Sequence, residues 1–373
     1  METGHFSIAP TADGSDTFFS ETFGEWFHSR SGAYEEARST YVQATGLVER
    51  AQQQGGITLL DVCYGLGYNT AAALEGIWAV QPETPIHLVG LELDESVPRA
   101  AIAQGLLHDW PLPVQAALAA IATHHRVVGG HPGPHPKSLS QNWERDLPQP
   151  SQNWERDLLR PPFSQSGARD LLRPPFSQSG ARDSLRPPFS QFWEKGLGDE
   201  GGVLAAPPFY PNRTHLTADL LIGDARQQIQ TLVKSGFQAD VIFLDPFSPP
   251  RCPQLWTVEF LGLVAQCLHP QGILATYSCA AAVRTALKLA GLHLGSLAAP
   301  GRRWPSTLAS WTDIHLPPLS PQELEHLETR AAVPYRDPTL GDLAAAIHQR
   351  RAQAQAVSSL QSTGAWRRRW LSS

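Results

Sequence analysis

Five short apolar segments constrain the fold of this chain more than any other feature, because each has the length of a buried strand. They lie at residues 57–61, 87–92, 220–224, 240–245 and 272–277. Helical periodicity follows the first segment at 71–80 and the third up to residue 232. Continuous apolar strands that alternate with amphipathic helices are typical of a mostly parallel sheet covered on both faces. The pattern therefore predicts an α/β fold.

Four of these segments end in an acid, namely Asp61, Glu92, Asp224 and Asp245. In a parallel sheet with right-handed crossovers, the carboxyl ends of the strands and the loops that leave them lie along one edge. Ligands of such folds bind at that edge. We therefore expect the four carboxylates to gather around one ligand-binding site.

A turn with two glycines, Gly65 and Gly67, follows the first predicted strand. Glycine lets the backbone pass close to a ligand with φ values that other residues resist. A phosphate-binding P-loop would need Gly-Lys-Ser or Gly-Lys-Thr, which is absent here. A dinucleotide fingerprint would need glycine or alanine where Thr70 stands. The pattern acid-x-x-x-Gly-x-Gly instead resembles the first motif of class I S-adenosyl-L-methionine-dependent methyltransferases.

This resemblance implies a Rossmann-like, mostly parallel sheet of seven strands, with S-adenosyl-L-methionine as the cofactor. The turn from Asp61 through Gly65 and Gly67 would hold the methionine part. Glu92 lies about 25 residues past the turn, roughly the spacing of a ribose-binding acid. Asp94 is the alternative candidate for this role, and Glu92 would then be an ordinary solvated acid. In these enzymes an acid at the position of Asp224 accepts a hydrogen bond from the adenine amino group.

The fourth predicted strand leads into Asp-Pro-Phe-Ser-Pro-Pro-Arg-Cys-Pro-Gln-Leu-Trp at 245–256. This segment resembles the D-G-F-A-P-x-x-x-P-x-x-W signature of the tRNA 5-methylaminomethyl-2-thiouridine methyltransferases. The matching residues are Asp245, Phe247, Pro249, Pro253 and Trp256. Segments 27–38 and 274–284 are also similar to that family, and so is Asn69, which we count in the cofactor site. The resemblance covers most of residues 17–312 apart from an insertion.

The resemblance implies that the acceptor is the primary amine of 5-aminomethyl-2-thiouridine at the wobble position, in the anticodon region of tRNA. Asp245 is the predicted catalytic residue, which orients the amine and assists its loss of a proton; a helix N-cap is its alternative role. Phe247 and Trp256 are expected to stack on the base, or else to belong to the core. Arg251, Arg284, Arg302 and Arg303 are the cations predicted to contact phosphates.

Three residues depart from the family pattern. Asp61 stands where the family has glutamate, and Cys63 and Pro246 stand where it has glycine. Cys63 is small enough to preserve the turn, whereas Pro246 stiffens the loop that faces the acceptor. Bifunctional family members also carry a flavin-dependent oxidase domain, for which we expect no room in this chain, so only the methylation step is implied.

Residues 136–200 differ in character from the rest of the chain. The segment 140–147 recurs at 151–158, and the segment 160–170 recurs from residue 173 and begins again at residue 186. Short repeats with paired prolines suit neither a helix nor a central strand. We predict a disordered surface insertion at 136–200 that splits a methyltransferase domain into 1–135 and 201–316, with a helical tail at 317–373.

The net charge of −6 excludes a strongly basic polyanion-binding protein, so any contact with nucleic acid depends on local basic patches. The four cysteines form no C-x-x-C pair, and we expect neither disulfides nor a metal site. No segment approaches the length of a membrane span, and we expect a cytoplasmic protein that contacts no membrane. Two alternative functions stay open: methylation of another amine or a small molecule, and cofactor binding without catalysis in an RNA-interacting protein.

Overall fold

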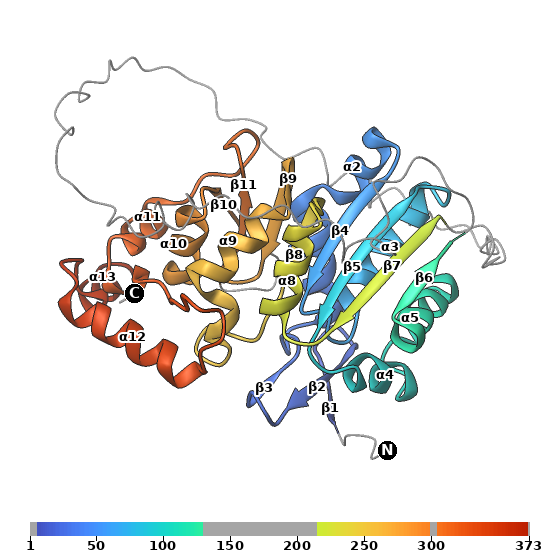
Figure 1. The fold of residues 1–373 in the computed structure, drawn as a ribbon, viewed down its shortest axis with the longest axis horizontal. Coiled ribbons are helices and arrows are strands. Elements are labelled where there is room, and N and C mark those ends of the chain that lie inside the picture. The colour runs from blue at the N-terminus through green and yellow to red at the C-terminus, as the bar shows by residue number, and fades with distance from the viewer. Residues whose placement is uncertain (1–5, 130–214, 299–303, 372–373) are drawn as a thin grey trace. The chain divides into compact units, whose positions relative to one another are not determined.

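The computed structural model describes residues 6–129, 215–298 and 304–371, all of which belong to one compact unit. Its centre is a sheet of eight strands in the order β10-β11-β9-β8-β4-β5-β7-β6. The predicted insertion at 136–200 lies outside the described residues. Figure 1 shows the sheet between two groups of helices.

The five central strands are parallel and correspond to the five apolar segments of the sequence. They are β4 (Ile57–Val62), β5 (Ile86–Glu92), β7 (Leu216–Ile222), β8 (Ala239–Leu244) and β9 (Leu268–Thr276). In β4, β5 and β8 nearly every residue is buried, because helices cover both faces of the sheet. The predicted α/β sheet is confirmed.

The sheet has one strand more than the predicted seven. At one edge, β10 (His293–Leu297) and β11 (Ser306–Ser310) add antiparallel strands beside β9. At the other edge, the three-residue strand β6 (Arg126–Val128) pairs antiparallel with β7. The number seven was implied by the family resemblance, whereas the residues themselves predicted five strands and none of β6, β10 and β11. A strand as short as β6 lies below the length at which a periodic pattern is visible in the sequence.

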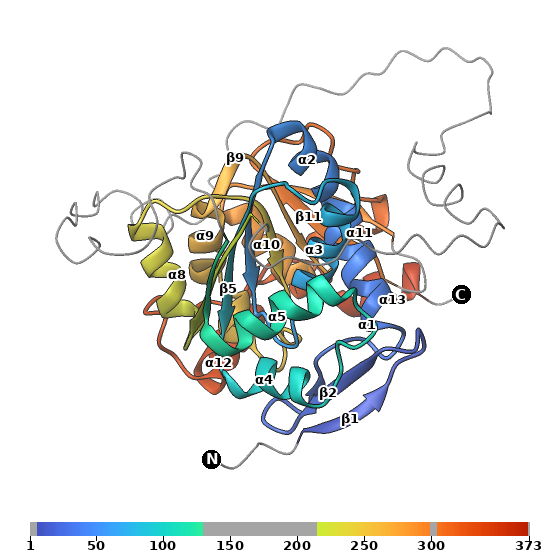
Figure 2. The same ribbon diagram turned by 90° about the vertical axis from the view of Figure 1, so that its right-hand side faces the viewer.

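The core helices that precede β7 in the chain and those that follow it cover opposite faces of the sheet (Figure 2). One group consists of α1 (Ala33–Glu36), the π-helix η1 (Ala37–Gln43), α2 (Leu47–Gln54), α3 (Tyr68–Val80), α4 (Ser96–Ala103) and α5 (Leu112–His124). The other consists of α8 (Ala225–Lys234), α9 (Val258–Gln266) and α10 (Ala281–Leu289). The strand order reverses at β4, which places the crevice of the fold between the ends of β4 and its neighbours.

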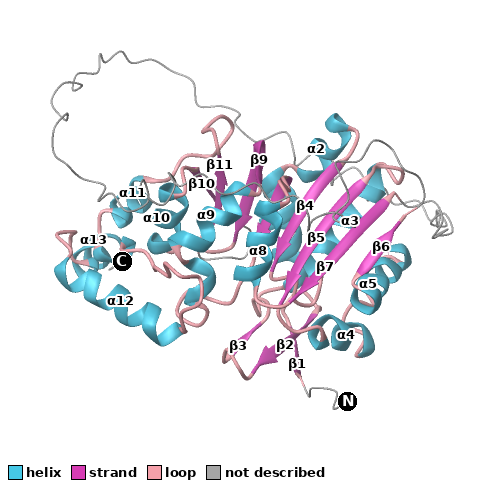
Figure 3. Ribbon diagram, in the orientation of Figure 1, coloured by secondary structure: helices cyan, strands magenta, loops and turns pink. Residues whose placement is uncertain are grey.

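Two further parts adjoin this core (Figure 3). An antiparallel sheet of β1 (Ser7–Pro10), β2 (Asp16–Ser20) and β3 (Glu25–Trp26), which the sequence did not predict, lies near the carboxyl ends of the parallel strands. The C-terminal part contains α11 (Pro321–Leu327), η3 (Arg330–Ala332), α12 (Ala344–Val357) and α13 (Thr363–Trp370). Its last helix is anchored by the buried Trp366, whose indole N–H donates to the Gln322 carbonyl at 3.0 Å.

Within the part of the chain that the structure describes, no helix is both long and apolar enough to cross a membrane.

Candidate active site

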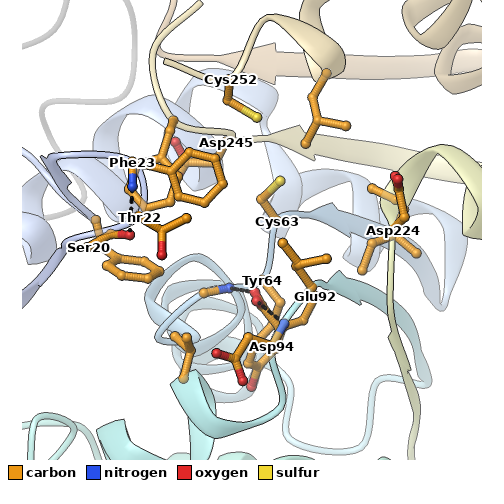
Figure 4. Close-up of a pocket in the computed structure, with 18 of the residues that line it drawn as sticks. Ser20, Thr22, Phe23, Cys63, Tyr64, Glu92, Asp94, Asp224, Asp245 and Cys252 are labelled. Atoms are coloured by element: carbon orange, nitrogen blue, oxygen red, sulfur yellow. Dashed lines mark hydrogen bonds between the residues drawn. The ribbon is translucent and has the colours of Figure 1, made fainter. Parts of the chain in front are cut away.

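A cavity of about 460 Å³ opens at the edge of the sheet where the parallel strands end (Figure 4). The turns after β4, β5, β7 and β8 form one wall, and residues of the small N-terminal sheet form the facing wall. Five of the predicted site residues line it: Gly65, Glu92, Asp224, Asp245 and Phe247. The structure therefore brings together three of the four acids that were expected at this edge, and the expectation is wrong for Asp61, which does not line the cavity.

The glycine turn between β4 and α3 has the left-handed backbone that such a turn requires. The φ angles of Gly65 and Gly67 are +56° and +86°. A Cβ atom at Gly67 would lie 2.9 Å from the Tyr64 hydroxyl, so a larger residue would displace the turn. Cys63, which also lines the cavity, has a φ of +69°, a conformation that costs a non-glycine residue about 1–3 kcal/mol.

Glu92 ties the glycine turn to the end of β5. Its Oε2 accepts a hydrogen bond from the Gly65 N–H at 2.7 Å, and its Oε1 accepts one from the Asp94 N–H at 3.0 Å. Burial raises the pKa of Glu92, and these backbone hydrogen bonds oppose that shift. Each carboxylate oxygen has two lone pairs. Both oxygens can therefore still accept a hydroxyl from a ligand in the cavity.

Asp224 is the N-cap of α8, and its Oδ1 accepts a hydrogen bond from the Arg226 N–H at 2.9 Å. The Arg226 guanidinium also donates to both carboxylate oxygens, with its shortest contact at 2.7 Å. Burial acts to raise the pKa of Asp224, but the hydrogen bonds and charge of Arg226 outweigh it and lower the pKa. Asp224 is therefore a carboxylate whose orientation depends on Arg226, a lining residue that the sequence analysis did not single out.

Asp245 follows β8 directly and is held on both sides. Its N–H donates to the Val62 carbonyl at 3.1 Å, and its Oδ2 accepts from the Asn69 amide at 2.9 Å. Burial and the nearby Asp245 carboxylate raise the pKa of Tyr41 and Tyr277, so both phenols stay neutral. The alternative role of Asp245 as a helix N-cap does not hold, because the next two helices begin after Cys252 and Thr257.

Phe247 lies in an aromatic cluster at the cavity. Its ring stacks on Phe23 with centroids 4.4 Å apart and meets the edge of Phe27 at 5.0 Å. Phe23 lies in the turn between β2 and β3, and only the tertiary structure places it there. Trp256 is fully buried and donates its indole N–H to the Phe247 carbonyl at 2.9 Å. It therefore supports the loop and presents no face to the cavity.

Asp61 lies beneath the glycine turn and not in the cavity. The side chain is fully buried, and its Oδ2 accepts from the Thr70 hydroxyl at 2.7 Å. Its Oδ1 has no hydrogen-bond partner among the described residues. Burial raises the pKa of Asp61 to about 8. At neutral pH the group is therefore mostly a neutral carboxylic acid that supports the turn from below.

The raised pKa of Asp61 predicts a pH-dependent stability. The unfolded chain loses this proton near pH 4, whereas the folded chain keeps it to about pH 8. The stabilising contribution is complete below pH 4 and disappears as the pH rises to 8. We expect the melting temperature of Asp61→Asn to fall less steeply between pH 5 and pH 8.5 than that of the original chain. Parallel melting curves for the two proteins would contradict this assignment.

The predicted phosphate-binding arginines differ in their surroundings. Arg251 is exposed, and its Nε lies 4.0 Å from Glu25. The prediction is wrong for Arg284, which is 2% exposed and forms an ion pair with Glu323 at 2.8 Å. Because the Arg284 guanidinium is buried and already paired with Glu323, it cannot reach an RNA phosphate. Arg302 and Arg303 lie outside the described residues.

Comparison with known proteins gives matches in family, sequence and structure. Residues 204–312 match the family model of S-adenosyl-L-methionine-dependent methyltransferases. The solved structure of MnmC2 from Aquifex aeolicus is similar, with a TM-score of 0.60 and 26% identity, over 95% of this chain and 86% of that chain.

Several relatives carry the name tRNA 5-methylaminomethyl-2-thiouridine biosynthesis bifunctional protein MnmC, and two of them illustrate the extent of the match. The protein from Methylobacillus flagellatus is 23% identical over 289 residues, which is 76% of this chain and 32% of the relative. A protein from Pseudomonas putida is 36% identical over 89 residues, which is 24% of this chain and 13% of the relative. The chain thus spans about a third or less of the length of these curated relatives.

Proposed function

We propose that this chain, an S-adenosyl-L-methionine-dependent methyltransferase related to MnmC, methylates the amine of 5-aminomethyl-2-thiouridine at the wobble position of tRNA. The observation that carries the proposal is the position of Asp245. This carboxylate lines the same cavity as the acids suited to the cofactor and the aromatic cluster suited to a base. The acceptor is the part of the proposal that rests most on the MnmC-like motif at 245–256.

The residues of the cavity fit S-adenosyl-L-methionine. Glu92 would bind the two ribose hydroxyls, because each of its oxygens keeps an open lone pair. Asp224 would accept a hydrogen bond from the adenine amino group. The tight turn at Gly65 and Gly67 would hold the amino-acid part, with Asp61 acting through the turn from below. When bound, the cofactor supplies a methyl group on a sulfonium sulfur.

The residues on the acceptor side have to orient an amine and remove a proton. An alkylammonium has no lone pair, so the substrate must lose a proton before it can act as a nucleophile. Asp245 accepts a hydrogen bond from the amine and takes up that proton. Asn69 and the Val62 carbonyl fix the carboxylate and its backbone, so little freedom remains to be lost during the reaction.

The pair of Phe23 and Phe247 would seat the base. We expect Phe23→Ala to lower kcat/KM for tRNA by about tenfold, because one stacked base contributes about 1–3 kcal/mol in single-strand binders. Binding of S-adenosyl-L-homocysteine should be unchanged. Phe23→Tyr, which keeps the aromatic face, is the matched control and should retain most activity. An unchanged kcat/KM in Phe23→Ala would remove Phe23 from the acceptor site.

The backbone of the tRNA requires cations at the rim of the site. Arg251 is the described candidate, since its side chain is more than half exposed beside the loop that carries Phe247. Arg302 and Arg303 stay predictions for the same role.

The tRNA substrate also favours the cytoplasm as the compartment. The division of the chain at 136–200 and 317, with an insertion outside the catalytic unit, likewise stays a proposal.

The test of the function is mass spectrometry of tRNA nucleosides. Protein, labelled S-adenosyl-L-methionine and tRNA that carries 5-aminomethyl-2-thiouridine should yield labelled 5-methylaminomethyl-2-thiouridine. Cells that lack the protein should accumulate the unmethylated nucleoside. Normal levels of the methylated nucleoside in such cells would contradict the tRNA assignment. Label on a small amine in place of tRNA would favour the alternative acceptor.

A further inference from the structure

Arg226 connects the cofactor cavity with the C-terminal part of the chain. On one side its Nε and Nη2 bind the Asp224 carboxylate, with the Nη2 contact at 2.7 Å. On the other side its Nη1 donates to the Asp337 carboxylate and to the Asp342 carbonyl, both at 3.0 Å. The Arg226 side chain is only 13% exposed, so these partners leave it little freedom to rotate.

Asp337 is well placed to fix the far side of this guanidinium. It is fully buried, and its Oδ1 accepts hydrogen bonds from the N–H groups of Gly341 and Asp342. Its own N–H donates to Glu259 of α9 at 2.8 Å. Asp337 is thus held both by its own turn and by a helix of the core, and it provides a rigid anchor for Arg226.

A carboxylate that recognises one amino group must keep a defined direction. A bidentate arginine sets that direction for Asp224, but only as far as the guanidinium itself is fixed. The anchor comes from a segment more than 100 residues away in the sequence. The C-terminal part therefore contributes to the precision of the cavity without lining it.

We propose that Asp337 is a positioning residue for the adenine end of the cavity, and that it acts through Arg226 on Asp224. The inference rests on the cofactor site of the proposed function and is independent of the acceptor. The contacts from Asp337 through Arg226 to Asp224 control whether the cavity selects a purine ring that carries a 6-amino group. The 6-oxo group of a hypoxanthine ring offers no such donor, and its oxygen would face the Asp224 carboxylate.

The test is calorimetry with S-adenosyl-L-homocysteine and its inosine counterpart, S-inosyl-L-homocysteine. The original chain should prefer the adenosine ligand. Asp337→Asn should weaken binding of that ligand about tenfold, as expected when a hydrogen bond to a charged group is misdirected. Binding of the inosine ligand should change little, so that the preference shrinks. A general loss of structure would weaken both ligands alike.

Asp342→Asn is the matched control, because the Asp342 carboxylate binds Arg350 at 2.6 Å and only its backbone carbonyl binds Arg226. This variant should keep the original preference. Arg226→Lys, which retains the charge without the fork, should reproduce the effect of Asp337→Asn. The double variant with both Asp337→Asn and Arg226→Lys should lose no further affinity for the adenosine ligand, since both changes interrupt the same connection to Asp224.

An unchanged preference in both Asp337→Asn and Arg226→Lys would overturn the inference, as would an equal loss for both ligands. If the original chain bound neither ligand, the inference would fail together with the cofactor site. A failure to methylate tRNA would leave it standing, because neither ligand donates a methyl group and no RNA is present in the experiment.

Discussion

Asp245→Asn is expected to lower kcat for tRNA methylation by about 10²–10⁴-fold, the usual contribution of a positioned general base. The asparagine amide can occupy the same space, but it cannot take up the proton of the substrate ammonium. The Asn69 amide donates a hydrogen bond to Asp245 in the original chain. If the NH₂ group of the new asparagine faced Asn69, two donors would meet and this hydrogen bond would be lost. Affinity for S-adenosyl-L-homocysteine should change by no more than about twofold.

The same substitution at the other end of β8 provides the control. Asp240 accepts a hydrogen bond from the Thr58 N–H at 2.8 Å and lies at the opposite edge of the sheet from the cavity. Asp240→Asn should therefore retain activity. Single-turnover rates and calorimetry separate the two steps for both variants. If Asp245→Asn turned over at the original rate, Asp245 would have no catalytic role, and the mechanism proposed for proton loss would be wrong.

Glu92→Gln is expected to weaken binding of S-adenosyl-L-homocysteine by about 100-fold or more. The substitution removes the charge that both ribose hydroxyls would meet. In the original chain the N–H groups of Gly65 and Asp94 each donate to one carboxylate oxygen of Glu92. The glutamine has only one oxygen, so its NH₂ group would face one of these two donors and that hydrogen bond would be lost. Two altered hydrogen bonds to a charged group, at about 1.5–3 kcal/mol each, account for a loss of this size.

Calorimetry measures this effect directly, and Glu95→Gln is the control. Glu95 lies three residues further along the chain, is about half exposed and pairs with Arg99, so its replacement should leave binding unchanged. Burial raises the pKa of Glu92, so this group takes up a proton at a higher pH than an ordinary glutamate. As the pH is lowered, the affinity of the original chain for S-adenosyl-L-homocysteine should therefore start to fall earlier than it would with an ordinary glutamate. Tight binding by Glu92→Gln would exclude Glu92 as the ribose-binding acid.

The candidate site residues that line the cavity are those whose position depends on local sequence. Glu92, Asp224 and Asp245 each follow a continuous apolar strand, and the parallel topology then brings their side chains to one edge. The glycine turn is also local, since a strand, a left-handed turn and a helix are adjacent in the chain. Such features follow from backbone preferences and from burial periodicity within about ten residues.

The remaining features depend on which distant segments meet. Asp61 and Asp245 look alike in the sequence, yet one lies beneath the turn and the other faces the cavity. Arg251 and Arg284 are both arginines near strand ends, yet only the first is exposed, because α11 brings Glu323 to the second. Side-chain burial is a property of the packed elements, and a local pattern of residues does not contain it.

The sequence by itself determined the parallel sheet, the edge at which the acids proposed for the cofactor site gather and, through its motifs, the class of cofactor. Only the tertiary structure decided that Phe23 stacks on Phe247, that Trp256 supports the loop from inside and that Arg226 is clamped between Asp224 and Asp337. The physical reason is the range of the interactions. Strands, turns and helices form from neighbours along the chain, whereas these contacts join segments that are close only after the helices and the N-terminal sheet have packed against the core.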